Sequence, residues 1–118
     1  MEEELVNACK EQNLERMEEL LKDGANIYTP IETSSTVLLY ICEHFMRYNI
    51  LDGIKLILNI NPDPNYINII DDDCCTVICY LVMNIINCLY MKIISEEDIS
   101  ALEYLLEHGA NPNIYSKA

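Results

Sequence analysis

The densest group of chemically reactive side chains in this sequence is a trio of cysteines, Cys74, Cys75 and Cys79. Closely spaced thiolates serve zinc and redox sites, but a structural zinc ion takes four Cys or His ligands, usually in spaced pairs. Neither His44 nor His108 is near these thiols in the sequence. We therefore expect no metal site and no cofactor. The alternative is a small metal-binding or redox-sensing protein built on these thiols, which the metal content of the purified protein would distinguish.

Motifs for catalysis are missing from the sequence. It contains no Gly-x-Ser-x-Gly, no His-Glu-x-x-His and no glycine loop for phosphate, and three glycines in all leave little room for one. Two acidic pairs, Glu18 with Glu19 and Glu96 with Glu97, fall on or at the start of amphipathic segments, which is typical of solvated helix faces. We expect no catalytic residues and a protein that is not an enzyme.

The charge balance is strongly acidic. Seven basic residues stand against 20 acidic ones, which gives a formal net charge of -13 at pH 7. Binding to a phosphate backbone depends on clustered basic residues, and this chain scatters its few. We therefore expect no nucleic-acid partner and no membrane partner. Long-range electrostatics favour a protein with a basic surface, and the alternative is that acidic helix faces only keep the protein soluble.

Several features indicate a cytoplasmic protein. The chain starts with Met1 and three glutamates, where a secretory signal would carry basic residues. Residues 77 to 94 resemble a membrane span in length, but Asn84, Asn87 and Lys92 interrupt them and acidic residues flank them, so we expect a buried helix. Cysteines inside apolar runs are typical of small buried side chains in a reducing compartment. These cysteines are Cys9, Cys42, Cys79 and Cys88.

A short phrase recurs along the chain and predicts where helices end. Residues 20 to 26 (LLKDGAN) are repeated as residues 105 to 111 (LLEHGAN), and residues 57 to 66 keep the same frame without the glycine. A glycine after the last apolar turn adopts the positive φ that caps the final carbonyls of a helix. Self-similarity at spacings of tens of residues indicates a repeat architecture.

A second helix precedes the phrase in each copy. Residues 36 to 42 and 76 to 82 both open on a threonine that can cap a helix, and they agree at Thr, Val and Tyr. Residues 5 to 10 take the same place near the N-terminus, and Gln12 and Asn13 separate them from the next helix. We expect one domain of residues 1–118 with units at about 1–30, 31–70 and 71–118.

This order of short helix, turn, longer helix and Gly-Ala-Asn loop resembles the ankyrin repeat. Residues 5 to 28 match best, with Ala8 and Cys9 at the family's alanine pair, whereas Val37 and Val77 stand where the family has proline. The resemblance implies an all-α ankyrin-repeat solenoid of about three divergent helix-turn-helix units with extended loops. The degenerate units and the Asn- and Ile-rich composition are similar to those of poxvirus ankyrin proteins, although amoebal giant viruses and intracellular bacteria use similar compositions.

Two stretches exceed the spacing of the ankyrin template. A few extra residues fall around 45 to 49, and about a dozen fall around 86 to 97. Because the second stretch is apolar, we expect it to extend the preceding helix. Residues 95 to 98 (SEED) then carry the signals of a new helix N-terminus.

The resemblance implies a binding surface made by the inner helices and the loop tips. Tyr40 and Tyr80 share one register on the inner helices, and tyrosine is enriched in binding surfaces. The equal alternative is that these two rings pack against each other inside the stack. The residues expected on the concave face and at the loop tips are Asn7, Lys10, Glu11, Tyr28, Tyr40, Glu43, His44, Tyr66, Asp72, Tyr80, Met83 and Asn84.

These observations favour a non-enzymatic protein–protein interaction module. The resemblance implies a host protein as the partner and a role as a viral host-range or immune-modulating factor in the host cytoplasm. One alternative is the substrate-binding N-terminal part of a longer ankyrin and F-box-like ubiquitin-ligase adaptor. Because no polar capping repeat follows the third unit, we expect either that the chain is the N-terminal piece of a longer repeat protein or that its last helix meets another chain, as in a homodimer. The residues expected there are Ile99, Leu102, Leu105 and Leu106.

Overall fold

The computed structural model describes residues 2–32, 34–61, 63–70, 75–91 and 96–111. Within these residues the chain forms helices and no strand, and an isolated bridge pairs Ile31 with Ser34. The prediction of an all-α protein is therefore confirmed for the described residues. The helices are α1 (Glu2–Glu11), α2 (Leu14–Lys22), α3 (Val37–His44), α4 (Arg47–Ile60), α5 (Pro64–Ile67), α6 (Val77–Tyr90) and α7 (Glu96–Glu107).

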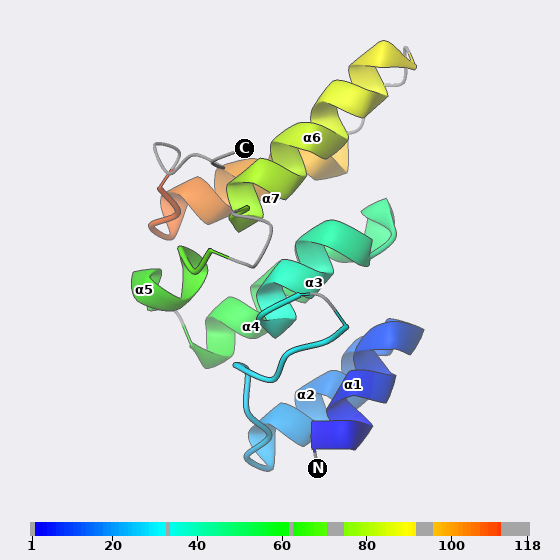
Figure 1. The fold of residues 1–118 in the computed structure, drawn as a ribbon, viewed down its shortest axis with the longest axis vertical. Helices are drawn as coiled ribbons and strands as arrows, with labels where there is room; N and C mark the ends of the chain where they lie inside the picture. Colours follow the sequence, from blue (N-terminus) through cyan, green and yellow to red (C-terminus); the bar gives the residue numbers. More distant parts are fainter. Residues whose placement is uncertain (1, 33, 62, 71–74, 92–95, 112–118) are drawn as a thin grey trace.

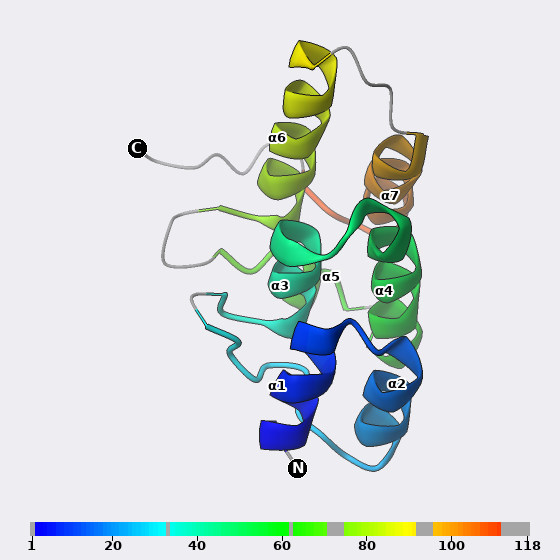
Figure 2. The ribbon, with the colours of Figure 1, turned by 90° about the vertical axis from the view of Figure 1, so that its right-hand side faces the viewer.

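The long helices are arranged as three pairs stacked along the long axis of the molecule. α1 packs on α2, α3 on α4 and α6 on α7 (Figure 1). Seen from the side, α1, α3 and α6 make one layer, and α2, α4 and α7 make the other (Figure 2). The connection from α2 to α3 runs out on the side of the first layer. Each pair therefore meets the next through both of its helices.

Threonine caps start α3 and α6, as the sequence predicts. The Thr36 side-chain oxygen accepts a hydrogen bond from the backbone N–H of Leu39 at 3.2 Å. The Thr76 oxygen accepts the equivalent bond from Cys79 at 3.4 Å. Both predicted caps are confirmed, and a cap of this kind stabilises a helix by about 1 kcal/mol.

Glycines end α2 and α7 in the same way. Gly24 has a φ of 108° and Gly109 a φ of 102°, a region that glycine adopts without strain. In both copies the N–H of the following alanine donates to the carbonyl five residues earlier, at 3.0 Å after α2 and 2.9 Å after α7. This closes each helix with a Schellman-type cap, and the two predicted helix ends are confirmed.

The predicted break at Gln12 and Asn13 is confirmed. Gln12 has a φ of 57°, and Asn13 Oδ1 accepts a hydrogen bond from the N–H of Arg16 at 3.1 Å to start α2. Gln12 Oε1 also accepts two hydrogen bonds, each 3.0 Å long, from the N–H of Met46 and from Asn49 Nδ2. One side chain thus joins the turn of the first helix pair to the turn of the second.

The stretches of irregular spacing lengthen helices. Two residues separate the end of α3 from the start of α4, and α4 and α6 each have 14 residues, whereas α3 has eight. The predicted extension of a helix by the second stretch is confirmed as far as Tyr90, and residues 92–95 lie outside the described residues. The predicted helix start at residues 95 to 98 agrees with α7, which begins at Glu96.

A continuous apolar core runs through the three pairs. Fully buried side chains such as Leu5, Ile57 and Leu81 come from successive pairs, and each stabilises the fold by about 1.5–3 kcal/mol. Gly53 lies where α4 meets α3, because a Cβ there would come within 3.0 Å of Ile41 Cγ2. None of the helices in the described residues combines the length and apolarity that crossing a membrane requires.

Candidate interaction site

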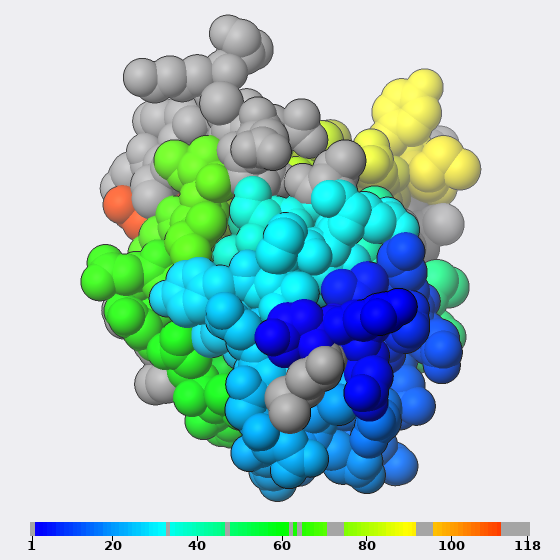
Figure 3. Space-filling view, turned by 60° about the horizontal axis from the view of Figure 1, so that its bottom comes forward, coloured from blue at the N-terminus to red at the C-terminus, as the bar shows by residue number. Residues whose placement is uncertain are grey.

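The two stretches of irregular spacing lie at the same edge of the stack. α3 ends at His44 because Phe45 and Met46 adopt extended backbone, with ψ angles of 148° and 145°. α6 runs past this level, and its C-terminal end stands clear of the other helices, in yellow at the upper right of Figure 3. Where α6 crosses α3, Asn84 Nδ2 donates to the carbonyl of Cys42 at 3.3 Å. The α3–α4 turn and the long α6 therefore face each other.

A hollow of about 460 Å³ opens between this turn and α6. We call it the α3–α6 hollow. Its lining residues are Glu43, Phe45, Met46, Tyr48, Ile50 and Asn84. Pockets of about 300–1,000 Å³ bind small ligands, so this hollow has room for one or two side chains of a partner.

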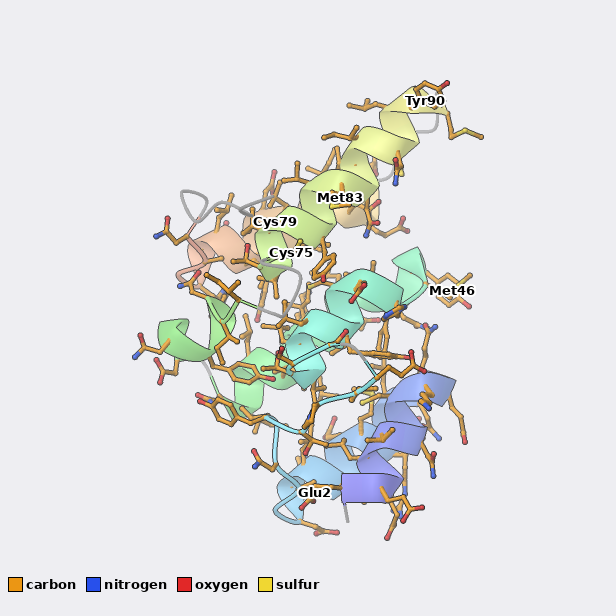
Figure 4. The ribbon with its side chains drawn as sticks, in the orientation of Figure 1. Glu2, Met46, Cys75, Cys79, Met83 and Tyr90 are labelled. Carbon is orange, nitrogen blue, oxygen red and sulfur yellow. The ribbon has the colours of Figure 1, made fainter. Side chains whose placement is uncertain are left out.

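The α3–α6 hollow has an apolar floor and an adaptable rim. Phe45 and Ile50 are buried beneath it, whereas Met46 is 53% exposed and Tyr48 67% exposed. Figure 4 shows Met46 projecting beside the C-terminal end of α3. Methionine adjusts its shape to a partner, and tyrosine offers a large contact area with a polar end. The rim is therefore suited to contact an apolar side chain.

Glu43 supplies a carboxylate to the lining of the hollow. Its Oε2 atom accepts a hydrogen bond from Ser34 Oγ at 2.9 Å and lies 3.5 Å from His44 Nε2. The His44 ring in turn packs on Tyr40, with centroids 4.7 Å apart. A half-buried carboxylate held in place in this way can pair with a lysine or arginine of a partner.

Tyr40 and Tyr80 lie inside the stack. They are 7% and 8% exposed, and the Tyr40 ring packs on those of His44 and Phe45. The prediction that they present their rings to a partner is wrong. For Tyr40 the reason is that residues 37 to 42 of α3 are all buried, so this part of the helix has no solvent-facing side.

Tyr66 is also a core residue, and its predicted place at an exposed loop tip is wrong. It belongs to α5, which the sequence did not predict, and it is 1% exposed. Its hydroxyl donates to the carbonyl of Ile27 at 2.8 Å and accepts from the N–H of Leu38 at 3.3 Å. Its ring meets that of Tyr28 edge to face, with centroids 5.0 Å apart. Tyr66 therefore ties the second connection to the first.

The predicted residues of α1 lie away from the α3–α6 hollow. Asn7 and Glu11 line a separate hollow at the first helix pair together with Arg16. Lys10 Nζ lies 3.5 Å from Glu32 Oε1, in an exposed ion pair with the connection that follows α2. These residues are accessible, but they do not form one surface with those of α3 and α6.

The remaining predicted residues lie partly at the α3–α6 hollow and partly outside it. Glu43 and Asn84 meet at the α3–α6 hollow. Tyr28 and His44 are exposed, and Met83 is 54% exposed on the middle of α6, where Figure 4 shows it. Asp72 lies outside the described residues.

The described cysteines do not gather into a ligand cluster. Cys75 and Cys79 are partly exposed at the start of α6 (Figure 4), and Cys74 lies outside the described residues. The part of the chain that the structure describes holds no group of three or more His, Cys, Asp or Glu residues that could bind a metal. Burial raises the pKa of the Cys9 thiol to about 12 and also raises the pKa of Cys42, so both stay protonated and unreactive.

Sequence analysis missed the apolar lining of the hollow, namely Phe45, Met46, Tyr48 and Ile50. The signal that could have found it is the irregular spacing around residues 45 to 49 and 86 to 97. The first stretch covers the α3–α4 turn and the start of α4, and the second includes the C-terminal part of α6, so both belong to the same edge of the stack.

Comparison with known proteins finds no match to this chain, either among models of protein families or among curated sequences. What the α3–α6 hollow can bind follows from its own residues. A buried apolar floor, a rim of Met46 and Tyr48 and the carboxylate of Glu43 suit an apolar side chain that has a basic neighbour.

Proposed function

We propose that this protein is a non-enzymatic protein-binding module built from ankyrin-type repeats. The stacked helix pairs, the matching threonine caps of α3 and α6 and the matching glycine caps after α2 and α7 support the repeat relationship. The α3–α6 hollow is the observation that carries the function. Insertions in repeat proteins map to one face, which is often the binding face, and the first departure from regular spacing supplies Phe45, Met46 and Tyr48 to the lining of the hollow.

The partner anchors an apolar side chain in the α3–α6 hollow. Met46 and Tyr48 close around it, and Glu43 pairs with a basic residue beside it. Binding energy in interfaces concentrates on a few anchors that fill pockets and exclude water, and exposed Met and Tyr side chains over a buried floor provide such a pocket. We therefore propose binding at the turn edge of the stack, and the burial of the tyrosines expected to anchor a partner on the concave face supports this choice.

The partner we propose is a host protein with a basic surface. A net charge of -13 attracts basic proteins over long range and raises the rate of their encounter. The resemblance to poxvirus ankyrin proteins supports a viral factor that acts in the host cytoplasm.

Affinity purification from a mammalian cell lysate, followed by mass spectrometry, tests this proposal. The bait is the whole chain, and the test variant carries Met46→Ala and Tyr48→Ala at the hollow. The control carries Asn7→Ala and Tyr28→Ala, which truncate two exposed side chains that do not line the hollow. We expect a host protein that binds the parent and the control and is lost from the test variant.

Circular dichroism should show equal helicity for all three proteins, because the four side chains are exposed. Loss of the partner from the Asn7 and Tyr28 variant alone would return the binding surface to the concave face and the loop tips. If the parent retains no protein above a bead-only control, the proposed function is contradicted.

A further inference from the structure

The second leucine of the repeated phrase is buried in two copies and exposed in the third. Leu21 in α2 is 5% exposed and its counterpart Leu58 in α4 is 3% exposed, whereas Leu106 in α7 is 41% exposed. The preceding residue of each copy is buried in all three. α4 packs beside α2 and α7 packs beside α4, so the second leucine is covered where another helix pair follows.

The inner helices show the same difference at equivalent positions. Cys42 in α3 is fully buried, and its counterpart Val82 in α6 is 37% exposed. On α6, Asn84 faces α3, since it bonds the carbonyl of Cys42. At 100° per residue, Val82, Ile86 and Leu89 fall on the opposite side of the helix. Ile86 and Leu89 are 57% and 63% exposed.

Together these positions make an apolar surface on the far side of the third pair. We call it the α6–α7 end face. Ile99 and Leu106 in α7 are 43% and 41% exposed and Leu102 between them is partly buried, at the spacing of one helix stripe. The residues that define the end face are Val82, Ile86, Leu89, Ile99, Leu102 and Leu106.

Within α6 and α7, as far as the structure describes them, the charges have one sign. α6 (Val77–Tyr90) contains no charged residue, and α7 (Glu96–Glu107) contains five acidic residues and no basic one. Four of these acids, Glu96, Glu97, Glu103 and Glu107, are exposed. A second copy of this chain would bring the same acidic helix against it, and like charges facing each other oppose binding.

We propose that the α6–α7 end face binds an amphipathic helix of another protein, with leucine-like residues on one side and lysine or arginine along its flanks. In the first two pairs, the positions equivalent to this face are covered by helices of the next pair. We therefore expect the partner to cover the end face with a helix as well. The acidic flank sets its charge. This surface is separate from the α3–α6 hollow, so the inference goes beyond the proposed function and does not depend on it.

Binding of synthetic helices to the whole chain tests the proposal. One probe is a labelled peptide of about 20 residues with leucines on one helix face and lysines beside them, a length at which an isolated helix can form. The second probe replaces the lysines with glutamates. We expect the lysine-flanked peptide to bind and to weaken as salt is added, and the glutamate-flanked peptide not to bind.

Matched variants separate docking from general charge attraction. Val82→Glu with Leu106→Glu places two charges on the end face, and we expect affinity for the lysine-flanked peptide to fall by at least about tenfold. Asn59→Glu with Asn65→Glu adds the same charge at exposed positions elsewhere and should not weaken binding. Ile86→Ser with Leu106→Ser removes the apolar contact without adding charge and should also weaken binding.

Four results would overturn the proposal. Equal binding by the parent and both end-face variants would show attraction by net charge alone, and no binding by the parent would exclude the surface. Sedimentation of the parent as a dimer that Leu106→Glu dissociates would assign the face to a second copy. Loss of peptide binding in the Met46→Ala, Tyr48→Ala variant, with both end-face variants unaffected, would move the peptide to the α3–α6 hollow.

Discussion

The two junctions of the stack, between the first and second pairs and between the second and third, are held together by different means. At the first junction, the buried Tyr66 hydroxyl bonds Ile27 and Leu38. At the second, Asn68 makes the equivalent tie at the surface, donating to the carbonyl of Gly109 at 3.0 Å and accepting from Asn111 at 2.7 Å. Helix packing is more extensive at the second junction, where α7 lies along α4.

The contrast shows that stacked helix pairs can be joined by polar ties and by apolar helix contact in different proportions. Stability in such a stack is approximately a sum of unit terms and nearest-neighbour terms, so each junction can be weakened separately. The comparison predicts that apolar truncation has its largest effect where a neighbouring pair covers the side chain, and that removal of a polar tie has its largest effect where the tie is buried.

The largest effect is expected from Leu58→Ala in α4. Leu58 is 3% exposed, and loss of a buried leucine side chain lowers the free energy of unfolding by about 2–5 kcal/mol. Leu106→Ala, at the equivalent place in α7, should lower it by less than about 1 kcal/mol because Leu106 is already 41% exposed. Urea unfolding of both variants measures the difference, and equal losses would contradict it.

Tyr66→Phe, at the first junction, should lower the free energy of unfolding by about 1–3 kcal/mol. It leaves the carbonyl of Ile27 and the N–H of Leu38 buried without their hydrogen bonds to the Tyr66 hydroxyl. Asn68→Ala, at the second junction, should lower the free energy of unfolding by less than about 1 kcal/mol, since water can replace the hydrogen bonds of this amide at the surface. Thermal melts of both variants test the order. A larger loss for Asn68→Ala would reverse the comparison.

Alkaline pH should act on the first junction. Burial raises the pKa of Tyr66 above its ordinary value of 10.0, so the folded state holds the phenolic proton more tightly than the unfolded chain does. The contribution of this tight proton binding to the free energy of unfolding is fully present below pH 10 and is lost as pH rises. The loss from Tyr66 should reach about 1 kcal/mol at pH 11. Unfolding midpoints measured between pH 8 and 11 should fall, and Tyr66→Phe should reduce the slope above pH 10. An unchanged slope would exclude Tyr66 as its source.

The threonine caps should show the smallest difference between the two parts of the stack. Thr36→Ala and Thr76→Ala each remove a local hydrogen bond to the first turn of a helix and should each cost about 1 kcal/mol. Because a cap acts within its own helix, the two losses should agree within about 0.5 kcal/mol. Thr→Ser at either position keeps the oxygen and should restore most of the stability, as urea unfolding would show.

Local signals in the sequence predicted the helices well. The threonine caps, the glycine ends and the break at Gln12 and Asn13 each depend on a few neighbouring residues, so their chemistry is visible without the fold. The expected order of a short helix before a longer one holds for α3 and α4, but it is wrong for the other two pairs, since α1 has 10 residues and α2 nine, and α6 has 14 and α7 12. α5 was missed because its four residues carry no apolar period.

The candidate site was harder to predict because burial depends on neighbours that are distant in sequence. The residues adjacent to a tyrosine in the sequence do not show whether its ring faces solvent or a neighbouring helix pair. All three of Tyr40, Tyr66 and Tyr80 are buried. Met46 and Asn84 are 38 positions apart and line one hollow only because α6 packs beside α3 at the edge where the α3–α4 turn lies. Irregular spacing marked that edge, but the hollow itself required the packing of α6 over α3.

Gln12 couples the first helix pair to the rim of the α3–α6 hollow. Its Oε1 atom accepts from the backbone of Met46 and from Asn49, so the rim of the hollow is held in part by the turn of the first helix pair. Fraying of α1 and α2 therefore releases one wall of the hollow, and a molecule bound there opposes that fraying. By thermodynamic linkage, occupancy of the hollow should slow amide hydrogen exchange in α1 and α2, which it does not touch. The rate of hydrogen exchange in the first helix pair then reports whether the hollow is occupied.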